Sequence, residues 1–205
     1  MNISKRLISI SFILINILGI SIYFSFNPNF YLKHFDTPQI TNINKTDIQN
    51  IYSFLQNKSD LNNNFTALEA SHLRDVQKIF SIIYYILRIS ILVFVLNVSF
   101  LIYSKKSNQI LKLLFIGSII TLSFILVLIF TTALNFRLSF NIFHEIFFPQ
   151  GNRSFPIDSN LIKLFPESFF ILISQKIFYT ISIISLIIII FYLIKKKTSR
   201  EVNNI

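Results

Sequence analysis

Histidine and carboxylate side chains form one short pattern that could move a proton. His72 lies three residues after Glu69 and three residues before Asp75, so on a helix the three side chains share one face. A carboxylate beside a histidine can fix its tautomer and stabilise its charged form, as a general base requires. A structural explanation is also open at this stage, because Glu69 suits a helix cap and Asp75 suits a membrane interface.

The second candidate, His144, lies within the apolar stretch Phe140–Phe148 and is followed by Glu145. It is compatible with a catalytic role or with an amphipathic anchor at the membrane interface. The third histidine, His34, lies in a polar segment without helical periodicity, and we interpret it as a solvated loop residue. The sequence has no HExxH, GxSxG or P-loop motif and no cysteine, so metalloprotease, α/β-hydrolase and thiol chemistry lack support.

Charged side chains mark candidate ligand contacts. Arg88 lies eight residues into the apolar stretch from Phe80 to Tyr103, where a charge is costly unless it faces a polar interior or a ligand. A phosphate, a carboxylate or an ester carbonyl would suit its guanidinium group. The alternative is that the span starts later and Arg88 extends toward the membrane surface. We take Arg88, with Arg153 and Glu145 of the second polar loop, as candidate substrate-binding residues.

These side chains must be positioned by helices in a membrane. Of the 205 residues, 53% are hydrophobic and 14% are charged. A bilayer core about 30 Å thick needs roughly 20 apolar residues in a helix, and four stretches qualify: about residues 7–26, 80–103, 113–134 and 177–194. The stretches are continuous, which excludes the short alternating strands of a membrane barrel. We therefore predict an all-α integral membrane four-helix bundle, as a single domain over residues 1–205.

The basic residues predict the orientation of this bundle. Segments 1–6, 104–112 and 195–205 hold nine basic residues and one acidic residue, whereas the long loops 27–79 and 135–176 are almost neutral. Lys and Arg concentrate on the cytoplasmic side of membrane proteins. We expect a multi-pass protein of the cytoplasmic membrane with both termini inside and all three histidines on the outer face. The net charge of +10 is then no sign of nucleic-acid binding.

Capping patterns predict helices within the outer loops. Residues 46–49 (Thr-Asp-Ile-Gln) resemble a capping box with Thr46 as the N-cap of a short amphipathic helix, Asp47–Asn57. Residues 66–69 (Thr-Ala-Leu-Glu) repeat the pattern and predict a helix that runs without a break into the second span. Pro166 suits the first turn of a helix that leads into the fourth span.

Two other function classes remain open from the residues alone. Four helices with two histidines are compatible with a haem protein that has two histidine ligands, although both histidines lie near the outer edge of the predicted bundle. A non-catalytic membrane partner or assembly protein is also compatible, with the outer loops as its interaction surface. Loss of a histidine would leave the function of such a partner intact, whereas truncation of a loop would not.

Two motifs resemble signatures of a known family. Residues 69–76 (Glu-Ala-Ser-His-Leu-Arg-Asp-Val) resemble the E-x-x-H-x-x-D-V signature of a family of small bacterial integral membrane proteins. Residues 143–148 (Phe-His-Glu-Ile-Phe-Phe) and 161–167 resemble its second signature. This family contains the lipoprotein intramolecular transacylase, and the resemblance extends over most of the chain. The family often carries a tryptophan where this chain has residues 152–155, and this chain has none.

The resemblance implies a definite reaction. The substrate is a diacylglyceryl-modified lipoprotein, and the sn-2 acyl chain moves to the α-amine of its N-terminal cysteine, which gives the lyso form. No external acyl donor and no cofactor or metal is used, and the partners are the lipoprotein and membrane lipids. We expect one of His72 and His144 to deprotonate the amine and the other to stabilise the oxyanion or protonate the leaving alkoxide, with Asp75 or Glu69 orienting His72.

Overall fold

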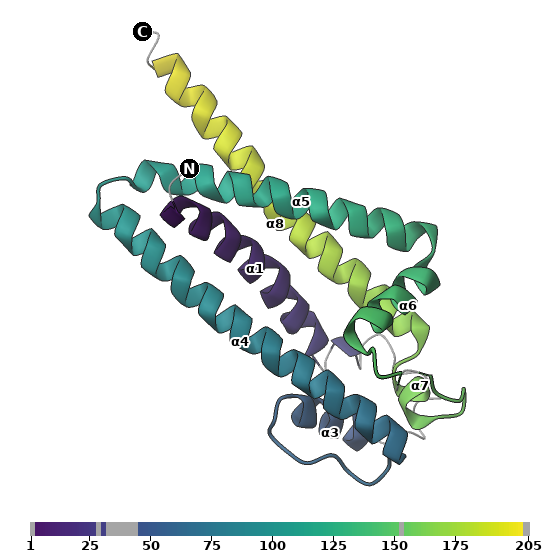
Figure 1. Cartoon of the computed structure of the whole chain (residues 1–205). Helices are drawn as coiled ribbons and strands as arrows, with labels where there is room; N and C mark the ends of the chain where they lie inside the picture. The colour runs from purple at the N-terminus through teal and green to yellow at the C-terminus, as the bar shows by residue number, and fades with distance from the viewer. Residues whose placement is uncertain (1–2, 28–29, 32–44, 152–153, 203–205) are drawn as a thin grey trace. The chain divides into compact units, whose positions relative to one another are not determined.

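The computed structural model describes residues 3–27, 30–31, 45–151 and 154–202 (Figure 1). His34 and Arg153 lie outside these residues. Helices make up all the regular secondary structure of the described residues, and no strand occurs among them. The predicted all-α class is therefore confirmed.

Four long helices account for the four predicted apolar stretches: α1 (Ile3–Ser25), α4 (Ala67–Tyr103), α5 (Ile110–Leu134) and α8 (Glu167–Val202). Each contains a segment that is long and apolar enough to cross a membrane. With 37 and 36 residues, α4 and α8 are each about 55 Å long at 1.5 Å per residue, which exceeds the roughly 30 Å of a bilayer core. Both helices therefore have length to spare beyond a single crossing.

Shorter helices lie between the long ones: α3 (Lys45–Leu55), α6 (Phe136–Phe147), α7 (Asn160–Leu164) and a 3₁₀ turn, η1 (Ser107–Gln109). The short helix expected in the first outer loop is confirmed as α3. It begins at Lys45, so Thr46 lies in its first turn and its prediction as the N-cap is wrong. The polar anchor near this end is Asp47, whose carboxylate accepts hydrogen bonds from the side chains of Asn62 and Asn64.

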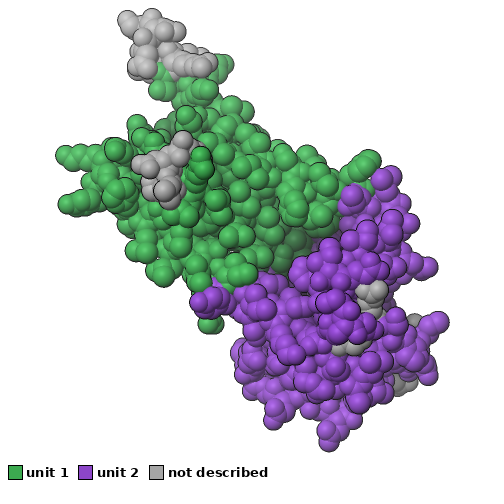
Figure 2. All heavy atoms as spheres, viewed as in Figure 1, with its two compact units in different colours: residues 1–21, 86–130, 177–205 green, residues 22–85, 131–176 purple. Residues whose placement is uncertain are grey.

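The chain divides into two compact units, which Figure 2 shows in different colours. Unit 1 comprises Met1–Ser21, Ile86–Phe130 and Ile177–Ile205, and unit 2 comprises Ile22–Tyr85 and Thr131–Lys176. Unit 1 therefore contains long apolar helix segments, and unit 2 contains the short helices α3, α6 and α7 with the first part of α4. The single-domain organisation stays a prediction.

Within unit 1, α1 and α5 approach each other closely. A Cβ atom added to Gly117 would lie 2.9 Å from Cδ1 of Phe12 and 3.3 Å from the carbonyl oxygen of Ser9. The Ser9 hydroxyl donates a hydrogen bond to the carbonyl oxygen of Leu113, at 3.0 Å. Small residues and hydroxyl groups commonly make such close helix contacts in membranes, so a larger side chain at Gly117 would push the two helices apart.

Within unit 2, hydrogen bonds join segments that are far apart in the chain. The Gln77 side chain of α4 donates to the carbonyl oxygen of Phe54 in α3, at 2.6 Å. The buried Tyr31 donates its hydroxyl hydrogen to the carbonyl oxygen of Leu164, the last residue of α7. Burial raises the pKa of Tyr31 to about 12, so the hydroxyl remains a donor at neutral pH. These contacts give unit 2 a fixed framework for the side chains of both signatures.

Candidate active site

Unit 2 brings together the two histidines that the signatures single out. The ring centroids of His72 in α4 and His144 in α6 lie 6.2 Å apart, and the ring planes differ by 13°. His72 is 8% exposed, and His144 is partly buried. Residues 72 positions apart in the sequence thus form one pair of imidazoles on unit 2.

Phenylalanine rings surround this histidine pair. The ring centroid of the buried Phe148 lies 4.6 Å from that of His72 and 5.4 Å from that of His144. Phe155 lies 5.3 Å from His72, and Phe140 lies 4.2 Å from His144. Apolar surroundings limit the access of water and strengthen the electrostatic interactions of the polar groups that remain. The pair therefore suits a reaction on an ester carried by an acyl chain.

The hydrogen bond of His144 indicates its tautomer. Its Nδ1 atom lies 2.8 Å from the carbonyl oxygen of Phe140, one turn earlier in α6. A carbonyl oxygen can only accept, so Nδ1 must carry the hydrogen atom. The neutral ring then has its lone pair on Nε2. In this tautomer, a neutral His144 can accept a proton at Nε2, as a general base does.

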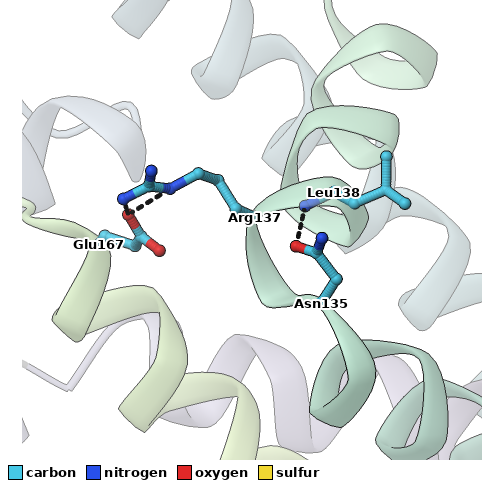
Figure 3. Close-up of polar contacts among 4 residues, drawn as sticks. All are labelled: Asn135, Arg137, Leu138 and Glu167. Carbon is cyan, nitrogen blue, oxygen red and sulfur yellow. Dashed lines mark hydrogen bonds and ion pairs between the residues drawn. The ribbon is translucent and has the colours of Figure 1, made fainter.

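Polar contacts hold the N-terminal end of α6, which carries His144 (Figure 3). The Asn135 side chain caps the helix by accepting a hydrogen bond from the backbone N–H of Leu138, at 2.9 Å. Arg137 donates from Nε and Nη2 to Oε2 of Glu167, at 3.3 and 3.2 Å. Since Glu167 begins α8, this ion pair connects α6 to the next long helix. One cap and one exposed ion pair thus hold the start of α6, and the His144 ring further along the helix packs against Phe140 and Phe148.

Glu69 is 1% exposed and joins α4 to α7. Its Oε2 accepts from the backbone N–H of Thr66 at 2.8 Å, and its own N–H donates to Oγ1 of Thr66 at 3.3 Å, which confirms the predicted capping box. Its Oε1 accepts from the backbone N–H of Leu161 at 2.9 Å. One carboxylate therefore serves the first turns of two helices, three residues before His72.

Asp75, one turn after His72, connects α4 to the segment that follows α6. Its Oδ2 accepts a hydrogen bond from Nε2 of Gln150 at 2.8 Å, and its Oδ1 accepts from Nζ of Lys78 at 3.0 Å. Gln150 precedes Gly151, whose φ of 82° is a backbone conformation that favours glycine. The carboxylates on either side of His72 thus each contact the second outer loop.

The three candidate substrate contacts differ in where they lie. Glu145 is exposed on α6, directly after His144. Arg88 is exposed on the part of α4 that belongs to unit 1, whereas the cluster around the histidines belongs to unit 2. Arg153 lies outside the described residues. Within residues 3–27, 30–31, 45–151 and 154–202, no group of three or more His, Cys, Asp or Glu residues could hold a metal ion.

Several residues of this site were not among the sequence-based candidates. Gln150 and Phe155 reach Asp75 and His72 from the second outer loop, and Phe148 contacts both histidines. Phe148 had a local signal, since it ends the first part of the second signature. The contacts of the other two depend on the path of the loop.

Comparison with known proteins supports the resemblance. The sequence model of one family, the lipoprotein intramolecular transacylases, matches residues 6–170. No curated protein matches the chain. Among solved structures, the membrane integral lipoprotein intramolecular transacylase from Bacillus cereus has a TM-score of 0.78 and 22% identity, over 97% of this chain and 96% of that chain. A variant of that enzyme with a histidine-to-arginine substitution has a TM-score of 0.70 and 23% identity, over 96% of this chain and 93% of that chain.

The structural likeness, at this level of identity, shows a shared fold. It agrees with the four candidate spans and with a multi-pass membrane protein. The family match carries the assignment of function, because it extends over more than half of the sequence. This chain belongs to the lipoprotein intramolecular transacylase family, and the predicted enzyme class is thereby confirmed.

Proposed function

We propose that His72 and His144 form the centre at which the sn-2 acyl chain of an S-diacylglyceryl lipoprotein moves to the α-amine of the N-terminal cysteine. The observation that carries this proposal is the pairing of the two imidazoles, 6.2 Å apart, inside a cluster of phenylalanine rings. An ester is converted into an amide, and the product is the lyso lipoprotein. Both reacting groups belong to one molecule, so the enzyme mainly has to fold the substrate into an attack geometry.

The transfer step balances without an external reactant. The neutral amine nitrogen attacks the sn-2 carbonyl carbon, a C–N bond forms, and the carbonyl becomes a tetrahedral oxyanion. The bond between this carbon and the sn-2 glyceryl oxygen then breaks. The proton that leaves the nitrogen is carried by a histidine to the glyceryl oxygen, which departs as an alcohol. One histidine can therefore act first as base and then as acid.

We assign the base to His144 and the oxyanion donor to His72. The assignment of the base is supported by the hydrogen bond from Nδ1 of His144 to the Phe140 carbonyl, which leaves the lone pair on Nε2. His72 is buried in the long helix α4, and a fixed donor suits oxyanion stabilisation. A positioned base contributes about 10²–10⁴ in rate, so loss of His144 should remove most of the activity.

The charged neighbours take supporting roles in this proposal. Glu69 and Asp75 hold the second outer loop against the helix of His72, and in this way orient the histidine. Glu145, Arg88 and Arg153 bind polar groups of the lipoprotein or of surrounding lipids. The role of Glu145 is supported by its place beside His144, and the roles of the two arginines are supported by their charge.

The proposed location follows from the distribution of charge. The basic tails and the basic loop at 104–112 favour the cytoplasmic membrane with both termini inside, and the histidine pair then faces outward. At that face the pair would meet the acyl chains and the amine of a lipoprotein, among membrane lipids and without a nucleic-acid partner. The family match favours acyl transfer over a haem protein or a non-catalytic assembly protein.

A reporter lipoprotein tests the function. The chain is expressed in a host without this enzyme, and the N-terminal peptide of the reporter is examined by mass spectrometry. The original chain should give the N-acyl, S-monoacylglyceryl form, and His72→Ala or His144→Ala should give the unrearranged diacylglyceryl form. His34→Ala, the matched change at the third histidine, should retain the product. Full product from either site variant would overturn the assignment.

A further inference from the structure

Unit 2 contains a pocket beside the histidine pair. Its volume is about 400 Å³, and it is lined by Thr66, which precedes α4, by the first turn of α4 with Glu69, and by residues 155–156 and 158–160, which lead into α7. This volume lies in the range of pockets that hold small ligands or part of a larger one, roughly 300–1,000 Å³. The function proposed above places no part of the substrate in this pocket.

Hydrogen bonds hold the two walls of this pocket together. Glu69 of α4 accepts from the backbone N–H of Leu161, at 2.9 Å. Nδ2 of Asn160 donates to the carbonyl oxygen of Asn64, at 2.7 Å. The Ser159 hydroxyl caps α7 by accepting from the backbone of Ile162, at 3.3 Å. These bonds are made within the protein, so the pocket has its shape before any ligand binds.

The pocket adjoins the histidine pair through two of its own lining residues. Phe155 lines the pocket, and its ring centroid lies 5.3 Å from that of His72. Glu69 also lines it and lies one helical turn before His72. A substrate with its cysteine amine at the histidines could therefore extend its next residues past Phe155 into this space.

The lining of the pocket is mostly apolar, with Leu68, Phe155 and Pro156, and it also carries polar groups that can pair with a peptide. Asp158 provides an exposed carboxylate at the pocket. A carboxylate accepts hydrogen bonds from backbone N–H groups and attracts a cationic side chain. Phe155 and Pro156 provide an apolar side against which a peptide can pack.

We propose that this pocket binds the peptide segment that follows the acylated cysteine, with Asp158 favouring a basic over an acidic side chain. The inference rests on the proposed function, because it takes the reacting cysteine to lie at His72 and His144. It adds to the enzyme a pocket that prefers some amino-acid sequences over others in the polypeptide part of the lipoprotein.

Three synthetic S-diacylglyceryl substrates test this proposal with the purified full chain. They are a cysteine amide, a cysteine peptide continued by serine and lysines, and the same peptide with glutamates in place of lysines. The lysine peptide should have a KM about three- to fivefold below that of the glutamate peptide, the range expected of an exposed ion pair, with a similar kcat. Asp158→Asn should remove this difference, and Asp158→Lys should reverse it.

Asp60→Asn provides the matched control, because Asp60 is also exposed and lies outside the pocket lining. This variant should keep the preference of the original chain. Equal KM values for the two peptides, or a preference that survives Asp158→Lys, would overturn the proposal. Conversion of the cysteine amide by the original chain measures acyl transfer separately. A failure of the pocket can thus be distinguished from a failure of the proposed function.

Discussion

The two histidines of the site are held by very different supports. His72 is buried on a 37-residue helix, and the fully buried Glu69 connects the start of that helix to α7. His144 lies on the 12-residue helix α6, none of whose residues is buried, and an exposed ion pair holds its start. Buried hydrogen bonds to a charged group resist disruption more than exposed ones. We therefore expect the position of His72 to be the fixed reference and that of His144 to be the easier one to perturb.

Replacing each histidine with phenylalanine separates the chemical role of the ring nitrogens from the packing role of the ring. His144→Phe and His72→Phe keep an aromatic ring within the phenylalanine cluster and remove the nitrogen atoms. We expect the rate of lyso-product formation to fall about 10²–10⁴-fold for His144→Phe, the usual contribution of a positioned base. The thermal midpoints of both variants should stay close to that of the original chain. If a variant lost activity only because it unfolds, the prediction that these changes remove the chemistry and keep the packing would be contradicted.

The buried carboxylate should matter more for stability than an exposed one. Glu69→Ala leaves the backbone N–H groups of Thr66 and Leu161 without their acceptor, which should cost about 2–4 kcal/mol of unfolding free energy. Glu69→Gln keeps one acceptor oxygen and should recover part of this loss. Unfolding in detergent measures both, with Glu145→Ala on α6 as the exposed control, expected within about 0.5 kcal/mol. Equal losses at Glu69 and Glu145 would mean that burial and hydrogen bonding of the Glu69 carboxylate do not raise its contribution to stability.

The cap of α6 should have a smaller and more local effect. Asn135→Ala removes the acceptor for the N–H of Leu138, and loss of such a cap costs about 1 kcal/mol. Hydrogen exchange should become faster in the first turn of α6 and stay unchanged in the first turn of α4. Faster exchange in both helices would show that their supports are coupled.

The ion pair between Arg137 and Glu167 should have the smallest effect. Both side chains are exposed, and exposed pairs contribute about 0.2–1 kcal/mol. A double-mutant cycle with Arg137→Ala and Glu167→Ala measures the coupling in unfolding free energy, which should weaken as salt is added. A coupling of several kcal/mol would contradict the description of α6 as weakly held.

Local patterns predicted the framework of the molecule well. The four spans, the unbroken helix α4 and the Thr66–Glu69 cap follow from apolar length and from the spacing of a few polar residues. Such signals need only neighbouring residues. The expected N-cap at Thr46 is wrong because α3 begins at Lys45, and the polar contacts near this end are made by Asp47 with Asn62 and Asn64.

Contacts between distant segments could not be predicted in the same way. Glu69 and Leu161 are 92 residues apart, and Asp75 and Gln150 are 75 apart. The helix α6 did carry a local signal, since Leu138, Ile142 and Ile146 recur every four residues. The continuous apolar character of the stretch hid this periodicity. The resemblance to the family supplied what spacing alone left open, because it linked the two signatures to one reaction.

The central claim is that the two histidines act as one unit in acyl transfer. Its most direct test is the single-turnover rate of the purified chain on a substrate labelled in the sn-2 acyl chain, followed by mass spectrometry. His72→Ala, His144→Ala and the double variant are compared, because residues that act together give strongly non-additive losses. We predict that each single change lowers the rate at least about 100-fold, and that the double variant is only slightly slower than either. A single variant that moves the label at the original rate, or losses that simply multiply, would contradict the account.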